Sequence, residues 1–220
     1  MEALHKTRIV VILTLLVPAL LAIFMYYCSR QHYATLPIIG EKVLDSKGDT
    51  IFHTLGDFKG TNQYGEAFGM DSLKGKIHIA DFIFTTCPGI CKQMSRSMLR
   101  LQTNFPNYED VRLVSYSIDA KTDTPPVLLK YAQNLKAQCY TWTFLTGNQD
   151  SIFHLAVKSY LVPVVFEEGK GDLGFTHSEF LVLVDKDLRV RGFYNGLKTS
   201  EIDKLLGDIK VLRYEYEKKK

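Results

Sequence analysis

Apolar and polar positions follow two distinct periods along the chain, and these periods predict both strands and helices. Short runs that are apolar almost throughout are typical of strands buried in a sheet, whereas apolar side chains three and four positions apart are typical of helices with one buried face. The predicted strands are Ile77 to Thr85, Val111 to Ile118, Thr141 to Leu145, Phe180 to Val184 and Val190 to Tyr194, and the predicted helices are Cys91 to Asn104, Pro125 to Lys136, Gln149 to Tyr160 and Thr199 to Tyr216.

The order of these elements predicts an α/β fold. Thr50 to Phe58 and Gln63 to Met70 are expected to pair as an N-terminal β-hairpin around Lys59-Gly60-Thr61-Asn62, which has the composition of a turn. Strands then alternate with helices, which favours a parallel central sheet flanked by helices on its faces. Two strands in succession near the end add an antiparallel edge. This order, with a Cys-x-x-x-Cys run after the first central strand, resembles a thioredoxin-like domain.

The first thirty residues do not belong to this domain. Ile9 to Tyr27 are nineteen residues without a charge, about the length that crosses a bilayer as one transmembrane helix. A cleaved signal peptide is the alternative, although its apolar core is usually shorter. The basic residues before this segment place the large domain outside the cytoplasm, on the periplasmic side in a bacterium or in the intermembrane space of a mitochondrion. We therefore expect a membrane anchor at 1–30, a tether at 31–49, the folded domain at 50–217 and a basic tail at 218–220.

Composition narrows the class of protein. The chain has 220 residues, 46% of them hydrophobic and 23% charged, with a formal net charge of +3. This is the composition of a globular domain with a sizeable core. No basic face interleaved with aromatic residues is apparent, so nucleic acid is not expected as a partner. Four cysteines, only two of them close together, do not make a disulfide-stapled scaffold.

The close pair, Cys87 and Cys91, is the strongest chemical signal. The two cysteines stand four positions apart where a strand ends and a helix is expected to begin. In a helix this spacing brings both sulfurs to one face, and the helix N-terminus lowers thiol pKa values and favours thiolate. Two such thiols form a disulfide, bind a soft metal ion, or alternate between the two.

Four blocks of sequence resemble the Sco/SenC family. They are Gly75-Lys76 leading into the run Phe82 to Cys91, then Val114 to Pro125, Thr141 to Gly147, and His177-Ser178 before Phe180 to Asp185. Together they cover roughly Phe68 to Gly196. The resemblance implies a membrane-tethered, thioredoxin-like, copper-binding protein associated with assembly of the binuclear copper site of cytochrome c oxidase. The implied partners are the copper-site subunit of that oxidase or another copper chaperone.

The resemblance also implies a ligand set. Cys87, Cys91 and His177 would bind copper, as Cu(I) or Cu(II), and no organic cofactor is expected. Two thiolates and an imidazole suit Cu(I), whereas zinc normally takes a fourth ligand that the sequence does not supply. Asp119, at the exit of the second strand, is a candidate to orient a ligand or tune thiol protonation, and a simple turn aspartate is the alternative.

Other chemistry remains open at this stage. The pair could be an inert disulfide, or the redox centre of a thiol–disulfide reductase that keeps the copper-ligand cysteines of a partner reduced. A peroxiredoxin-like peroxidase is a third candidate, since Thr85-Thr86-Cys87 faintly resembles the signature of that class. Whether the protein is an enzyme is therefore undecided. Cys139 is expected to pack as a small apolar residue, and Met94 and Met98 to form a core stripe.

Overall fold

A computed structural model describes residues 16–25, 35–87, 89–106, 108–162 and 178–218. The chain forms two units, Met1–Thr35 and Leu36–Lys220. In the first unit residues 16–25 are helical. Among the described residues, no helix combines the length and the hydropathy needed to cross a bilayer. The remainder of the expected anchor, including residues 9–15 and 26–27, lies outside the described residues.

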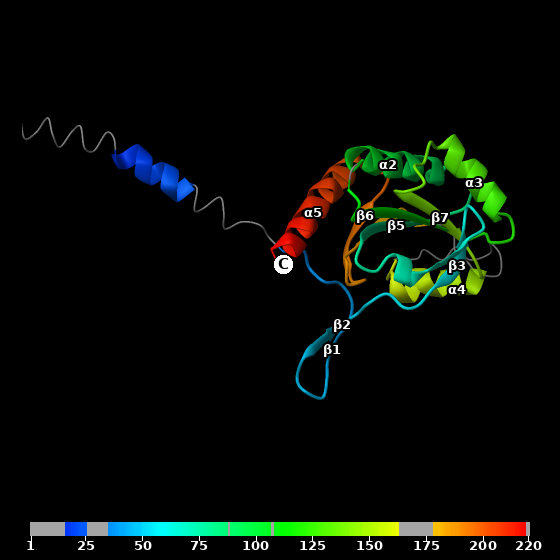
Figure 1. The fold of residues 1–220 in the computed structure, drawn as a ribbon, viewed down its shortest axis with the longest axis horizontal. Helices are drawn as coiled ribbons and strands as arrows, with labels where there is room; N and C mark the ends of the chain where they lie inside the picture. Colours follow the sequence, from blue (N-terminus) through cyan, green and yellow to red (C-terminus); the bar gives the residue numbers. More distant parts are fainter. Residues whose placement is uncertain (1–15, 26–34, 88, 107, 163–177, 219–220) are drawn as a thin grey trace, which may run out of the picture. The chain divides into compact units, whose positions relative to one another are not determined.

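The second unit is built on a seven-stranded sheet with the order β4-β3-β7-β6-β5-β8-β9 (Figure 1). The central strands β5, β6 and β7 are parallel, and the flanking strands pair antiparallel. The strands of this sheet are β3 (Lys59–Asn62), β4 (Ala67–Gly69), β5 (Ile77–Ile83), β6 (Val111–Ser117), β7 (Trp142–Thr146), β8 (Phe180–Val184) and β9 (Val190–Asn195). All seven residues of β5 are buried, as its largely apolar run predicts.

Helices cover both faces of the sheet, so the core has two halves. α2 (Ile90–Asn104), α3 (Pro125–Asn134) and α5 (Thr199–Glu217) pack on one face, and Met94 and Met98 lie in that half as predicted. α4 (Gln149–His154) and the π-turn η2 (Leu155–Ser159) pack on the other, beside a short 3-10 turn η1 (Met70–Ser72) (Figure 1). The predicted helix at Gln149 to Tyr160 is therefore an α-helix that widens into a π-turn. The predicted α/β architecture is confirmed.

The N-terminal hairpin is present but is made of other residues than predicted. Lys59–Asn62, predicted to be the turn, is strand β3, and the turn comes one segment later. The side chain of Asn62 causes this shift, because its Oδ1 accepts hydrogen bonds from the backbone N–H groups of Tyr64 at 2.9 Å and Glu66 at 3.0 Å. Gly65 supplies the positive φ of 82° that completes the turn.

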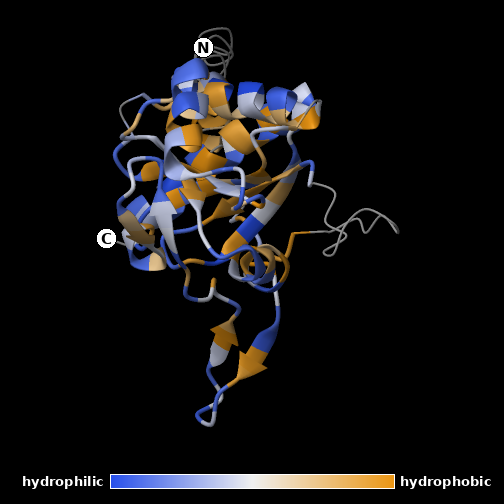
Figure 2. Cartoon of the chain, turned by 90° about the vertical axis from the view of Figure 1, so that its right-hand side faces the viewer, coloured by the Kyte–Doolittle hydropathy of each residue, from blue (hydrophilic) through white to orange (hydrophobic). Residues whose placement is uncertain are grey.

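A second hairpin lies where we predicted a tether. Strands β1 (Lys42–Leu44) and β2 (Thr50–Phe52) pair with each other and form a separate two-stranded sheet. Val43, Leu44 and Ile51 are exposed, and their hydrophobic colouring stands out on this hairpin in Figure 2. The segment 31–49 therefore contains a strand, and Thr50 to Phe58 does not form the continuous strand that we predicted.

Candidate metal centre

The two cysteines stand at the carboxyl end of β5, where open α/β sheets place their sites. The chain turns after Ile83, and α2 begins at Ile90, so Cys91 lies in its first turn. The backbone N–H of Cys91 donates to Sγ of Cys87 at 3.4 Å, and the N–H of Cys87 donates to the carbonyl of Phe84 at 3.2 Å. Both thiols are free, and the residues are only 7% and 3% exposed. The predicted convergence of the two sulfurs on one site is thus present.

The surroundings make the two thiols unequal. Burial opposes ionisation of Cys87, but hydrogen bonds from the Cys91 thiol and from the N–H groups of Cys91, Gly89 and Ile90 outweigh it and lower the pKa of Cys87. Burial raises the pKa of Cys91, which also donates to the Cys87 sulfur and feels the negative charge of Cys87 and Asp81. Cys87 therefore favours the thiolate form, and Cys91 favours the protonated form.

Asp123 fixes the loop that carries Cys87, a role that the sequence reasoning missed. It is fully buried, and its carboxylate accepts from the Thr85 N–H at 3.0 Å and from the Thr85 hydroxyl at 2.5 Å. It also accepts from the Ser117 hydroxyl at 2.6 Å. Asp123 thereby ties the exit of β5 to the exit of β6. Its spacing from Thr85, 38 residues along the chain, gives no local signal.

Asp81 is a second buried carboxyl group that the sequence reasoning passed over. It lies in the middle of β5 with no exposed surface, and Oδ1 accepts from the Ser115 hydroxyl at 2.5 Å. That hydroxyl accepts in turn from Nε1 of Trp142 at 2.9 Å. Oδ2 has no hydrogen-bond partner among the described residues, and burial raises the pKa of Asp81 to about 7. A single acidic residue within an apolar strand was the signal available in the sequence.

The structure also tests the expectations for two other residues, Asp119 and Cys139. Asp119 is half-buried, and its hydrogen bonds within the described chain hold the turn that joins β6 to α3: its N–H donates to Ser117, and Oδ1 accepts from Thr122. These contacts fit the simple turn aspartate that we named as the alternative. Cys139 is exposed, so the expectation that it packs in the core is wrong.

The third expected ligand cannot be placed. His177 lies outside the described residues, and the residue after it, Ser178, is buried at the entrance to β8. Within 16–25, 35–87, 89–106, 108–162 and 178–218 no group of three or more His, Cys, Asp or Glu side chains is placed to hold a metal ion. The ligand set of Cys87, Cys91 and His177 therefore stays a prediction.

The donor chemistry of the thiol pair fits a soft cation. Two sulfurs meet at a helix entrance, and one of them is held toward the thiolate form that soft metals bind. The same asymmetry also suits thiol–disulfide exchange, which starts from one ionised thiol. The pair alone thus supports two kinds of chemistry.

Comparison with known proteins finds similarity over most of the chain. The sequence profile of the SCO1/SenC family matches residues 47–212. The SCO1 protein homolog of Bacillus subtilis (strain 168) is 35% identical over 164 residues, which are 74% of this chain and 84% of the relative.

Two solved structures extend the likeness to the fold. BsSco, a member of the Sco family of cytochrome c oxidase assembly proteins in which a disulfide switch was identified, aligns with a TM-score of 0.63 and 35% identity over 73% of this chain and 93% of its own. Bradyrhizobium japonicum ScoI with copper bound aligns with a TM-score of 0.57 and 26% identity over 72% of this chain and 99% of its own. These alignments confirm the thioredoxin-like fold.

Proposed function

The chain belongs to the SCO1/SenC family, and from that premise we propose that it binds copper through Cys87, Cys91 and His177 and delivers it during assembly of cytochrome c oxidase. The observation that carries the proposal is the buried, reduced pair of thiols at the entrance of α2, one of them favouring thiolate. A relative with copper bound and another described as an oxidase assembly protein support it.

The three ligands and Asp123 have different roles in binding the metal ion. Cys87 supplies a thiolate, and its hydrogen bond from the backbone of Cys91 keeps that sulfur at the helix entrance. Cys91 must release its proton when it becomes a ligand, so copper uptake is coupled to proton release. Asp123 holds Thr85 and with it the loop before Cys87, which limits how far the first sulfur moves. His177 completes the set as the nitrogen donor, and three ligands of this kind suit Cu(I).

The partner and the location follow from the same premise. The recipient is the copper-site subunit of the oxidase, or a second copper chaperone that passes the ion on. The domain works outside the cytoplasm, tethered by the N-terminal segment. There the chain would meet its recipient at the membrane surface.

A test of the ligand set uses the full chain in neutral detergent, reduced and free of metal. We expect one Cu(I) ion per chain in competition with a chromophoric chelator. His177→Ala should weaken the affinity by more than about tenfold, because a lost ligand costs at least as much as a lost supporting contact. His154→Ala, in an exposed position on α4, is the matched control and should bind as the wild type does. Unchanged affinity in His177→Ala would reject this ligand set.

A second function is favoured by one observation, the unequal pKa values of the two thiols. A reductase needs an attacking thiolate and a second thiol that resolves the mixed disulfide, and Cys87 and Cys91 fit these roles. Cys91→Ser should then trap a mixed disulfide between Cys87 and a cysteine-containing partner when no metal is present. If copper uptake is normal and no such adduct forms, the reductase function is rejected.

A further inference from the structure

The outer face of α2 carries a row of positive charge. Lys92, Arg96 and Arg100 follow one another at intervals of four residues, so they project from one side of the helix. The fifteen residues of α2 include no aspartate or glutamate. We call these three side chains the cationic row. It begins one residue after Cys91 and extends about 12 Å along the helix, at 1.5 Å per residue.

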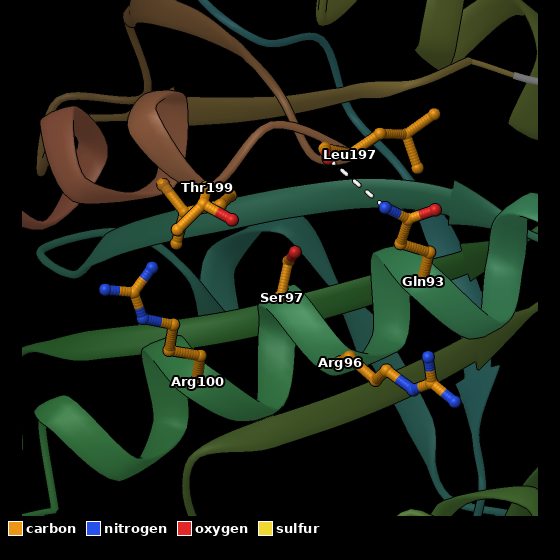
Figure 3. A pocket seen from close by; sticks show the side chains of 7 residues that line it. Gln93, Arg96, Ser97, Arg100, Leu197 and Thr199 are labelled. Atoms are coloured by element: carbon orange, nitrogen blue, oxygen red, sulfur yellow. Dashed lines mark hydrogen bonds between the residues drawn. The ribbon is translucent and has the colours of Figure 1, made fainter.

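Two of the three residues of the cationic row line a groove between α2 and the start of α5. The groove has a volume of about 390 Å³, and Arg96 and Arg100 stand on its α2 side (Figure 3). Leu197, which is partly exposed, gives the groove a small apolar part, whereas Ile202 is 1% exposed and belongs to the core. The groove therefore offers both positive charge and a small hydrophobic surface.

The wall opposite the cationic row is held firmly onto α2. Gln93 donates through Nε2 to the carbonyl of Leu197 at 3.2 Å, the contact drawn in Figure 3, and the Ser97 hydroxyl donates to the carbonyl of Gly196 at 2.6 Å. A Cβ added to Gly196 would lie 2.2 Å from Sδ of Met94, so only glycine allows this close approach. The groove is thus a fixed feature of the surface.

One end of the groove lies near the first turn of α2, but on the opposite side of that helix from the buried Cys91 side chain. Gln93, at this end of the groove, is two residues beyond Cys91 on the same helix. The N–H of Gly196 donates to the carbonyl of Glu179 at 2.7 Å, which joins the opposite wall to the start of β8. A molecule seated in the groove would therefore lie beside the first turn of α2.

In the described part of the chain, most of the positive charge of the cationic row has no acidic partner. Arg100 pairs with Asp203, and both side chains are largely exposed, so the pair contributes little. Arg96 makes no hydrogen bond or ion pair with the described residues and is exposed. Lys92 stands in the first turn of α2, and Lys198 precedes the first turn of α5, positions where a helix prefers negative charge. Like charges four residues apart also destabilise a helix slightly.

We propose that the groove binds an acidic segment of the protein that exchanges copper or electrons with Cys87 and Cys91. This inference rests on the proposed function and adds the chemistry of its partner. The row is too long for one small anion, and its cations favour several carboxylates spaced along a peptide. Leu197 would pack against an apolar side chain of the same segment. The groove thus selects the partner, and the thiols act on what it brings.

The binding test avoids thiol chemistry altogether. The probe is a fluorescent peptide of four glutamates and a leucine followed by Ser-x-x-x-Ser, with a second peptide in which glutamines replace the glutamates. Binding is measured by fluorescence anisotropy with the full chain in neutral detergent at low ionic strength. The chain should bind the acidic peptide about tenfold more tightly than the neutral one, because two or three exposed ion pairs supply about that difference in affinity. The double variant Arg96→Glu, Arg100→Glu should lose this preference.

The matched control is Lys210→Glu, which makes the same change of charge per site on an exposed position of α5. This variant should keep the preference for the acidic peptide. Equal binding of the two peptides by the wild type, or an equal loss in Lys210→Glu and in the double variant, would overturn the proposal. Binding of anionic phosphatidylglycerol vesicles through Arg96, without preference for the acidic peptide, would overturn it as well.

A second experiment joins the groove to the thiols. The same peptides are made with Cys-x-x-x-Cys as an internal disulfide and mixed with the reduced, metal-free chain. The Cys87 thiolate attacks one peptide sulfur and the peptide S–S bond breaks. Cys91 then loses its proton and attacks Cys87, which frees the second peptide thiol. Two electrons pass from the protein to the peptide, and the two peptide sulfurs take one proton from Cys91 and one from the solvent.

The acidic peptide should be reduced about tenfold faster than the neutral one, and the advantage should shrink at high salt. If both peptides are bound as expected but neither is reduced, the thiol function fails while the docking surface stands. If both are reduced at equal rates, the docking surface fails while the thiol function stands. The two proposals are therefore separable.

Discussion

Asp81 makes the folded protein lose stability as the pH rises, and Asp81→Asn should abolish this loss. The carboxyl group is fully buried and accepts one hydrogen bond, from Ser115, while its other oxygen has no partner in the described chain. Burial therefore raises its pKa from 3.8 to about 7. Asparagine keeps the shape and the accepting oxygen but has no charge to bury.

The sign and size follow from the two pKa values. Below pH 3.8 the group is protonated in both the folded and the unfolded chain, so it contributes no pH dependence. Between 3.8 and about 7 the folded state holds the proton and the unfolded state does not, so each added pH unit lowers the free energy of unfolding by about 1.4 kcal/mol. The full loss is on the order of 4 kcal/mol, and roughly 3 kcal/mol of it falls between pH 5 and pH 8.

The assay compares chemical unfolding of the two proteins, followed by circular dichroism in neutral detergent, at pH 5 and pH 8. The free energy of unfolding of Asp81→Asn, relative to the wild type, should rise by roughly 3 kcal/mol between these pH values. The cysteines are present in both proteins, so their contribution largely cancels. Asp57→Asn, at an exposed position, serves as the control and should follow the wild type. Parallel pH curves for Asp81→Asn and the wild type would refute the reasoning.

Three further tests address the thiol site and the chain segments that support it. Asp123→Ala should lower the free energy of unfolding by about 3 kcal/mol, because three hydrogen-bond donors lose their buried acceptor. Asp119→Ala should cost less than about 1 kcal/mol, and equal costs for the two variants would contradict the account of the loop. Iodoacetamide should alkylate Cys87 before Cys91 when peptides are mapped by mass spectrometry, and the reverse order would reject the assignment of Cys87 as the thiol that favours thiolate. Gly196→Ala should cost about 1–3 kcal/mol in chemical unfolding because the new methyl group overlaps a methionine of α2, and a neutral effect would show that this contact relaxes freely.

The sheet and its helices were readable from the sequence because their signals are local. β5 is apolar except for His78 and Asp81, and α2 shows methionines and leucines at helical spacing, so the apolar pattern located both. The thiol pair was found for the same reason, since four positions of spacing decide where two sulfurs lie on a helix.

The errors came from contacts that periodicity does not encode. The turn after β3 depends on which backbone groups the Asn62 side chain binds, and this moved the hairpin by one segment. The β1–β2 ladder joins two three-residue strands, too short for any alternation to stand out. The rule that free cysteines are buried is only a tendency, and Cys139 is an exception to it. In each case a local geometry outweighed a general preference.

The buried carboxylates show most clearly what only the tertiary structure supplies. Asp81 and Asp123 are the same residue type, both fully buried and both placed toward the thiol end of the sheet, yet their surroundings give them opposite roles. Asp123 accepts three hydrogen bonds and fixes the loop before Cys87. Asp81 accepts one, so burial dominates its pKa. Burial is also the main cause of the raised pKa of Cys91, and the charge of Asp81 adds to it.

Asp123, which accepts from three donors, holds the loop before Cys87. Asp81, which accepts from one donor, instead influences the protonation of Cys91. These two roles should be separable by mutation. Asp123→Ala should disturb the loop and the stability at every pH, whereas Asp81→Asn should leave the loop in place and make Cys91 easier to ionise, because a nearby negative charge is gone. Alkylation of Cys91 that speeds up in Asp81→Asn, with an unchanged rate at Cys87, would establish that division.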